Sequence, residues 1–141
     1  MTSSDSVYRY DFVIPESAID ENGHVNNVNY VQWMQDAAVR HFESLGGNVP
    51  MQEAGGTWVV HSHKIEYLSP AYAGEVIEIR TWIADVRRVR STRKYEFARK
   101  SDGKVLVKGE TDWVFVDAKS GRPIAIPVEV IKVFPAHIEK E

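Results

Sequence analysis

The sequence gathers its reactive side chains in one short segment, residues 20–29. Two acids, one histidine and four asparagines fall within these ten positions. A carboxylate such as Asp20 can attack a carbonyl carbon or take a proton from water, and Asn22 and His24 could orient that water or share the proton. This combination of residue types predicts hydrolysis or transfer of an acyl group.

Two simpler interpretations of this segment were weighed first. A calcium loop of the EF-hand type needs glycine at its sixth position, but Gly23 is the fourth position counted from Asp20, and the twelfth is Val31. We therefore reject calcium. The second interpretation is that Asn26 caps a helix while residues 20–23 form an Asx turn. It stays open, because a cap and a turn are compatible with catalysis and leave His24 without a role.

The residues after this segment have helical periodicity. Apolar side chains recur at helical spacing, at Val31, Met34, Ala38, Phe42 and Leu45. We predict a helix from about Asn27 to Leu45 that ends at the glycine pair 46–47. A helix N-terminus carries unpaired N–H groups and a partial positive charge, so it could stabilise the oxyanion formed in acyl transfer.

The rest of the chain alternates apolar and polar residues in the manner of strands. We predict strands over residues 8–14, 58–68, 76–86, 92–100 and 105–116, with a tight hairpin around Asp102-Gly103 and a short helix after Pro127. This order predicts an α+β fold in which an antiparallel sheet wraps one long helix. Strands of this length leave sheet edges to cover, so we expect at least a dimer.

Length and charge set further limits. We expect the 141 residues, 1–141, to form a single domain. Seventeen Lys and Arg against twenty Asp and Glu give a formal charge of -3, which favours neither nucleic acid nor an anionic membrane as a partner. The sequence has no cysteine, no signal-like start and no long apolar run, so we predict a cytoplasmic protein.

The reactive segment also resembles a known one. Hotdog-fold thioesterases, and the plant-type acyl-acyl-carrier-protein thioesterases in particular, have an active-site segment similar to Asp20-x-Asn22-x-His24-Val25-Asn26-Asn27-Val28-x-Tyr30-x-x-Trp33. The wider layout is similar to the 4-hydroxybenzoyl-CoA thioesterase superfamily, through Tyr67-Leu68-Ser69-Pro70, Gly74-Glu75-Val76 and Arg90-Ser91. The resemblance implies a hotdog fold, with five antiparallel strands around the helix. It also implies a homodimer, or a dimer of dimers, whose active sites are shared between subunits.

The same resemblance implies a function and roles for individual residues. The function is hydrolysis of a thioester of CoA or of acyl carrier protein. Asp20 matches the general base or nucleophile, Asn22 and His24 match catalytic positions, and the backbone N–H of Asn27 matches the oxyanion donor. We prefer activation of water by Asp20, because its two polar neighbours have no role if Asp20 attacks alone. The expected substrate contacts are Gly23, Val25, Tyr30, Arg88, Arg90 and Ser91.

The run from Arg87 to Lys94 is the one dense basic cluster. No RNA-binding motif accompanies it, and charged loop ends are often simply solvated. The hotdog resemblance assigns this region to the nucleotide or phosphopantetheine of the acyl carrier. Arginine suits phosphate because its guanidinium can form two parallel hydrogen bonds.

A metal ion and two other functions were also considered. His61 and His63 are two residues apart on a predicted strand, but they have no marked acidic partner, so we predict neither a metal nor any other cofactor. His41 has no neighbour in the sequence that suggests chemistry. The alternatives to a thioesterase are a hotdog dehydratase or hydratase and a non-catalytic acyl-CoA-binding hotdog protein. The trio of polar side chains on the 20–24 loop argues against a binding module.

Overall fold

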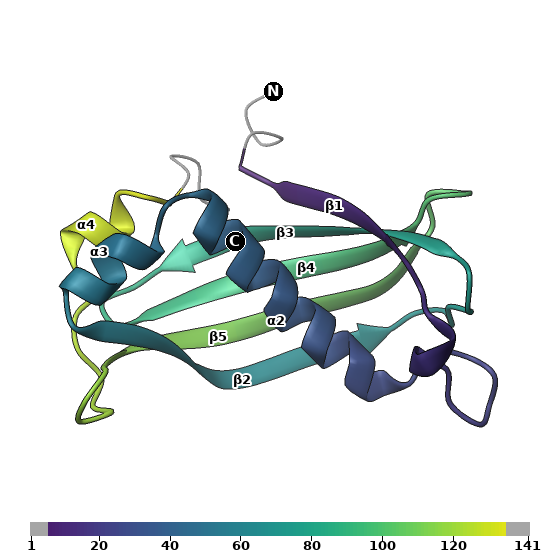
Figure 1. Cartoon of the computed structure of the whole chain (residues 1–141), viewed down its shortest axis with the longest axis horizontal. Helices are drawn as coiled ribbons and strands as arrows, with labels where there is room; N and C mark the ends of the chain where they lie inside the picture. Colours follow the sequence, from purple (N-terminus) through teal and green to yellow (C-terminus); the bar gives the residue numbers. More distant parts are fainter. Residues whose placement is uncertain (1–5, 135–141) are drawn as a thin grey trace.

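A five-stranded antiparallel sheet is the largest element of the computed structural model, which describes residues 6–134 (Figure 1). The spatial order is β1-β3-β4-β5-β2. The strands are β1 (Tyr8–Val13), β2 (Gly56–Tyr67), β3 (Val76–Val86), β4 (Arg90–Arg99) and β5 (Val105–Asp117). All five predicted strands are confirmed, with ends that differ by two residues at most. The single-domain prediction for 1–141 extends beyond the described residues.

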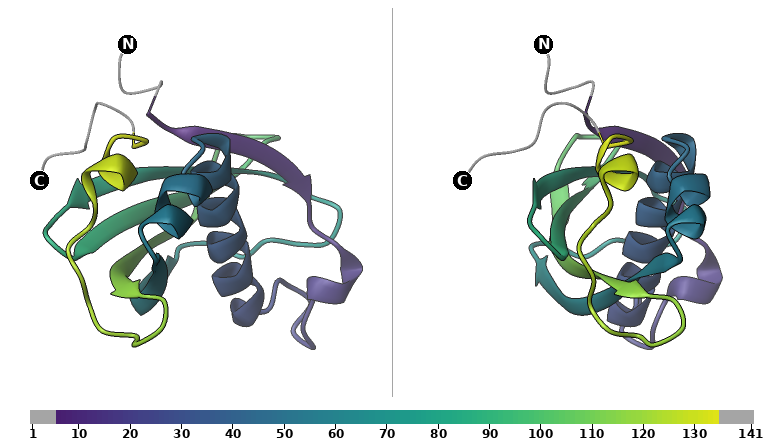
Figure 2. Two further views of the ribbon diagram at one scale, coloured as in Figure 1. Left: turned by 60° about the vertical axis from the view of Figure 1, so that its left-hand side comes forward. Right: turned by 90° about the vertical axis from the view of Figure 1, so that its left-hand side faces the viewer.

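The sheet curls around one long helix, α2 (Asn27–Ser44), which crosses its concave face (Figures 1 and 2). The predicted helix is confirmed at both ends. The side chain of Asn26 accepts a hydrogen bond from the N–H of Val28 at 3.0 Å, as a helix N-cap does. After Leu45 the chain reverses at Gly46, whose φ of 76° is a left-handed conformation that glycine adopts without strain.

Close contact between α2 and the sheet depends on a position without a side chain. A Cβ atom at Gly109 in β5 would lie 2.8 Å from the sulfur of Met34, which is fully buried on the inner face of α2. The core divides into two clusters along the helix. One surrounds Met34, and the other lies at the C-terminal end of α2 around Phe42 and Phe115.

Three short helices complete the described chain: η1 (Glu16–Ala18), α3 (Asn48–Glu53) and α4 (Val128–Ile131). The helix predicted after Pro127 is confirmed as α4. The other two were not predicted. Pro50 lies in the first turn of α3, where a proline is tolerated because that N–H has no partner within the helix. Tyr67, at the end of the edge strand β2, is 46% exposed.

The strand β2 forms one edge of the sheet. It is 12 residues long and pairs with β5 on one side. Among residues 6–134 no strand pairs with its other side, so a row of backbone N–H and C=O groups is left for another partner. A bulge between Val60 and Ser62 interrupts the register near the middle of the strand. Within the same residues no helix is long and apolar enough to cross a membrane.

Alanine substitutions at two glycines test whether the neighbouring side chains can move to make room for a Cβ atom. A Cβ atom at Gly56 would overlap the buried ring of Phe115, so Gly56→Ala is expected to lower the free energy of unfolding by about 1–3 kcal/mol. Gly109→Ala is the matched control with a smaller expected loss, because the end of Met34 is flexible and can move. Urea denaturation measures both. Equal losses would contradict this account.

Candidate active site

The polar segment before α2 forms a tight hairpin. The N–H of Asp20 donates to the C=O of His24, and the N–H of Gly23 donates to the C=O of Asp20, both at 3.0 Å. Ile19 and Val25 pair beside the turn. Gly23 has a φ of 85°, a left-handed conformation that closes the hairpin and favours glycine. Glycine at position 23 therefore has a structural role as well as its predicted substrate contact.

The Asp20 side chain is held at one oxygen. Its Oδ1 accepts a hydrogen bond from the N–H of Asn22 at 2.9 Å, which is the Asx turn that the sequence allowed. Among residues 6–134 no group forms a hydrogen bond or ion pair with Oδ2, and the residue is partly exposed. The carboxylate is thus oriented by the turn and keeps one oxygen for water or substrate.

Asn22 and His24 share this hairpin but do not hydrogen-bond to the Asp20 carboxylate through their side chains in the described structure. The Asn22 side chain is exposed. The His24 ring is half-buried and packs edge-to-face on Tyr72, with 6.4 Å between ring centroids. Sequence reasoning missed Tyr72, because it follows β2 and is far from the motif along the chain.

The backbone N–H of Asn27 is the free donor at the start of α2. The next two N–H groups are used, because Val28 donates to the Asn26 side chain and Asn29 to the Asn26 carbonyl, each at 3.0 Å. No acceptor in residues 6–134 contacts the N–H of Asn27. Its position at the positive end of the helix dipole suits an oxyanion.

The base of the hairpin is anchored in the core. The N–H of Val25 donates to the C=O of Ala71 at 3.0 Å, and the N–H of Asn26 donates to the C=O of Ala18 at 2.8 Å. Val25 and Tyr30 are almost fully buried, and burial raises the pKa of Tyr30 to about 12. Both side chains hold the site in place, and their contact with substrate stays a prediction.

The basic run lies far from this hairpin. Residues 87–89 join β3 to β4 at one end of the sheet, while the hairpin lies at the other end (Figure 1). Arg90 contacts the Asp112 carboxylate at 2.8 Å, and Ser91 is buried, with its hydroxyl donating to the Asp85 carbonyl at 2.9 Å. Arg88 is exposed. Within one chain these residues do not meet the hairpin, and their contact with a carrier stays a prediction.

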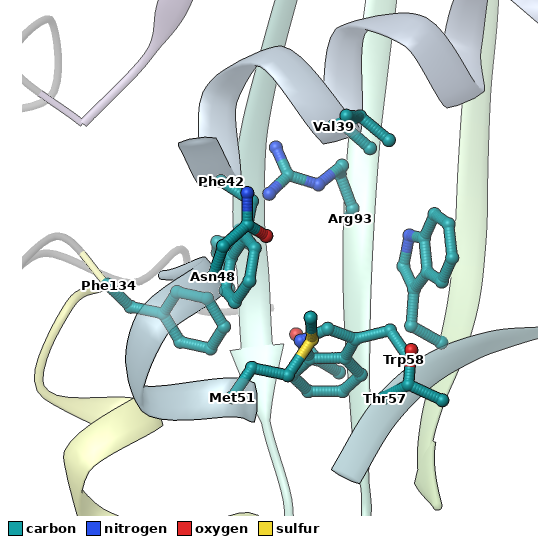
Figure 3. Close-up of a pocket in the computed structure, with 12 residues that line it drawn as sticks. Val39, Phe42, Asn48, Met51, Thr57, Trp58, Arg93 and Phe134 are labelled. Carbon is teal, nitrogen blue, oxygen red and sulfur yellow. The ribbon is translucent and has the colours of Figure 1, made fainter. Parts of the chain in front are cut away.

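A pocket of about 170 Å³ opens at the other end of α2 (Figure 3). It lies between α2, α3, the start of β2 and the concave face of the sheet. Its walls are mostly apolar, and its lining residues are Ala38, Val39, Phe42, Asn48, Met51, Thr57, Trp58, Ile83, Ser91, Arg93, Trp113 and Phe134. Sequence reasoning missed this pocket, because these residues come from seven separate segments of the chain.

Among residues 6–134, Arg93 is the only cationic residue that lines this pocket. It is 3% exposed, and its Nη1 donates to Thr81 Oγ1 at 3.1 Å and lies 2.8 Å from His41 Nδ1. No carboxylate in the described part of the chain forms an ion pair with it. Burial lowers the pKa of Arg93 to about 10, so the guanidinium keeps its charge at neutral pH.

His41 is the neutral partner of this cation. Burial, together with the charge of Arg93, lowers the pKa of His41 to about 3. Because arginine only donates hydrogen bonds, Nδ1 of His41 must accept and the ring proton must sit on Nε2. The ring also stacks on Tyr8, with 5.0 Å between centroids.

The two histidines of β2, His61 and His63, have different surroundings. His61 is exposed at the bulge of β2, whereas His63 lies 2.8 Å from the hydroxyl of Thr111, measured from Nδ1. Burial lowers the pKa of His63. In the portion of the chain that is described, no three His, Asp or Glu side chains are arranged to hold a metal ion.

Comparison of the sequence with known families finds one extended match. The sequence model of the thioesterase-like superfamily matches residues 14–134. An acyl-CoA thioesterase from Helicobacter pylori is 29% identical over 115 residues, which cover 77% of this chain and 85% of that protein.

Solved structures share the fold. A DHNA-CoA thioesterase from Staphylococcus aureus superposes with a TM-score of 0.76 at 22% identity, covering 84% of this chain and 80% of that one. A 12:0-ACP thioesterase from Umbellularia californica gives a TM-score of 0.83 at 20% identity, covering 96% of this chain and 53% of that one. The predicted hotdog fold is confirmed.

The lowered pKa of His41 predicts loss of stability in weak acid. The unfolded chain binds a proton at His41 near pH 6.5 and the folded chain only near pH 3, so protonation favours unfolding as the pH falls through this range. Between pH 7 and pH 5 the expected loss from His41 is about 2 kcal/mol. Urea denaturation at fixed protein concentration measures it.

His41→Asn tests the assignment, because the asparagine carbonyl can still accept from Arg93 but does not titrate. We expect this variant to lose most of the pH dependence. The exposed His61→Asn is the control and should keep it. A parent protein whose stability is level from pH 7 to pH 5 would contradict the burial of a neutral His41.

Proposed function

Because the chain belongs to the thioesterase-like superfamily and is a thioester hydrolase, we propose that it cleaves acyl thioesters of CoA or acyl carrier protein at the N-terminus of α2. One observation carries this placement. The free N–H of Asn27 begins the helix just after a hairpin that holds the Asp20 carboxylate with one unoccupied oxygen. A donor for an oxyanion and a base for water are the two groups that thioester hydrolysis requires.

In the proposed reaction the thioester carbonyl oxygen accepts a hydrogen bond from the N–H of Asn27. Negative charge grows on that oxygen as water adds to the carbonyl carbon. The helix dipole and the fixed N–H stabilise this charge, and a single donor of this kind contributes about 3 kcal/mol in other enzymes. Asn27 therefore acts through its backbone, and its side-chain type matters little.

Asp20 takes the proton from the attacking water, and Asn22 and His24 orient that water from the same hairpin. The tetrahedral intermediate collapses with cleavage of the carbon–sulfur bond. The proton held by Asp20 then passes to the departing thiolate, which leaves as the thiol of the carrier, and the carboxylic acid is released. Water activation explains all three polar side chains, whereas direct attack by Asp20 leaves two without a role.

The pocket beside Arg93 is the proposed site for the acyl group, but it needs a second copy of the chain. Asn27 and His41 lie fourteen residues apart on α2, or roughly 21 Å along the axis, so the pocket and the oxyanion donor of one chain are far apart. The free edge of β2 offers a solution. Two copies of this strand can pair antiparallel about a two-fold axis perpendicular to the sheet.

With the axis between His61 and Ser62, Gly56 of one copy lies opposite Tyr67 of the other. Tyr67 packs against Tyr30 in the first turn of α2, with 5.7 Å between ring centroids. Gly56 is followed by Thr57 and Trp58, which line the pocket. The pairing therefore brings the helix N-terminus of one copy to the pocket of the other, and the active site is shared. It also puts Arg88 of one copy at the same end as the hairpin of the other, in reach of a carrier phosphate.

The similar proteins guide which carriers and acyl groups are tested as substrates. The similar proteins include acyl-CoA, DHNA-CoA and 12:0-ACP thioesterases, so the substrate panel for this chain includes aliphatic and aromatic acyl groups. We keep Gly23, Arg88, Arg90 and Ser91 as proposed substrate contacts. The cytoplasmic location also stays a prediction.

Asp20→Asn tests the catalytic base. An asparagine oxygen can still accept from the N–H of Asn22, so the turn should survive while the charge is lost. We expect kcat to fall about a hundredfold or more with little change in Tm. Thiol release from a panel of short, long, branched and aromatic acyl-CoAs gives the rates.

Glu21→Gln is the matched control, because this exposed neighbour has no proposed role and should keep the parent rate. If Asp20→Asn is as active as Glu21→Gln, Asp20 is not the base. If the parent releases no thiol from any member of the panel, the proposed reaction is wrong.

The shared site predicts that dissociation abolishes hydrolysis. Acidic residues at both His61 and Ser62 would place like charges across the proposed axis, so the double variant H61D/S62D should be a monomer. Light scattering is expected to give about 32 kDa for the parent, twice the 16.0 kDa of one chain, and about 16 kDa for the variant. Lys119→Asp, in an exposed turn, is the control. A fully active monomer would overturn the shared site.

A further inference from the structure

We propose that the pocket beside Arg93 selects acyl groups that end in a carboxylate, so that the substrates are thioesters of dicarboxylic acids. The pocket combines apolar walls with one buried cation that has no acidic partner among residues 6–134. This inference rests on the proposed function, because it takes the pocket as the acyl site of a thioesterase. It adds the chemical group at the end of the acyl chain that lies away from the thioester.

The free edge of the Arg93 guanidinium matches a carboxylate. Both recorded hydrogen bonds use Nη1, which contacts His41 and Thr81. In the described chain no acceptor contacts Nε or Nη2, and these two nitrogens form the edge that binds both oxygens of a carboxylate in parallel. Figure 3 shows the guanidinium directed toward the part of the pocket where Phe42 and Asn48 lie.

An unpaired cation is costly at this position. Moving a charge out of water is unfavourable unless an opposite charge or a full set of hydrogen bonds replaces the solvent. Arg93 is 3% exposed, and its partners His41 and Thr81 are neutral. The carboxylate of a ligand would supply the negative charge that the described protein does not place beside the Arg93 guanidinium.

The size and walls of the pocket limit what carries that carboxylate. About 170 Å³ is close to the volume of cavities that hold a six-membered ring, so a chain of about six carbons or one aromatic ring fits. Phe42, Met51 and Trp58 would contact the methylene groups or the ring. The phosphates of CoA are a poorer match, because the exposed Arg88 can meet them without loss of their water.

Matched pairs of substrates test this inference. Adipoyl-CoA and hexanoyl-CoA have the same number of acyl carbons and differ in the terminal carboxylate, and succinyl, suberoyl and terephthaloyl thioesters with their uncharged counterparts extend the series. We expect the parent to prefer at least one carboxylate-ended member by tenfold or more in kcat/KM. In Arg93→Met the ratio of the two kcat/KM values should fall about tenfold or more, and Arg93→Lys should keep part of the preference.

The ratio within each pair does not depend on the fraction of folded enzyme, so a partly unfolded variant still gives a result. The exposed Arg122→Met is the control and should leave the ratio unchanged. The inference is overturned if the parent cleaves uncharged and carboxylate-ended thioesters equally, or if Arg93→Met keeps the ratio of the parent.

A binding measurement separates this inference from the proposed function. Free adipate is expected to raise the Tm of the parent more than hexanamide does, because hexanamide has no carboxylate, and to lose that advantage in Arg93→Met. If no thioester is cleaved but adipate behaves in this way, the proposed function fails and the carboxylate site stands. If thioesters are cleaved but adipate and hexanamide shift the Tm equally, the carboxylate site is wrong.

Discussion

The contact between α2 and the concave face of the sheet is the constraint on which the other features depend. The fully buried Met34 side chain of α2 packs against β5 at Gly109. This contact fixes both ends of α2 at once. Its N-terminus presents the Asn27 N–H beside the hairpin, and its C-terminal half covers the pocket that contains Arg93. A helix seated further out would separate these groups from the strands that complete them.

The two ends of the helix satisfy their polar groups in different ways. At the N-terminus, residues within the segment 20–29 bond to one another and to nearby carbonyl groups, which leaves one N–H and one carboxylate oxygen free. At the C-terminal end, a charged side chain is buried with only neutral partners. The first arrangement suits a developing negative charge, as the proposed reaction requires, and the second leaves a positive charge that the proposed ligand would neutralise.

The proposed pairing of β2 with its own copy would place these two ends, one from each chain, next to each other. In one chain they are separated by most of the length of α2, so neither end alone offers both the reacting groups and room for an acyl chain. Antiparallel pairing of an edge strand with its own copy reverses the direction of the second chain. In the proposed dimer this pairing would bring opposite ends of the two helices together, so the assembly that covers the exposed edge would also complete the site.

The sequence by itself determined the elements and the local conformation of the hairpin that forms the candidate site. Periodicity gave α2 and the five strands, and the hairpin was readable because Asp20, Gly23 and Asn26 act through bonds to residues within a few positions. The motif also carried the resemblance that the superfamily match confirmed. Only the tertiary structure decided the pocket and the state of Arg93. His41, Thr81 and Arg93 lie on three different elements and meet through helix packing and strand register, and no pattern along the chain encodes the energy of burying a charge among them.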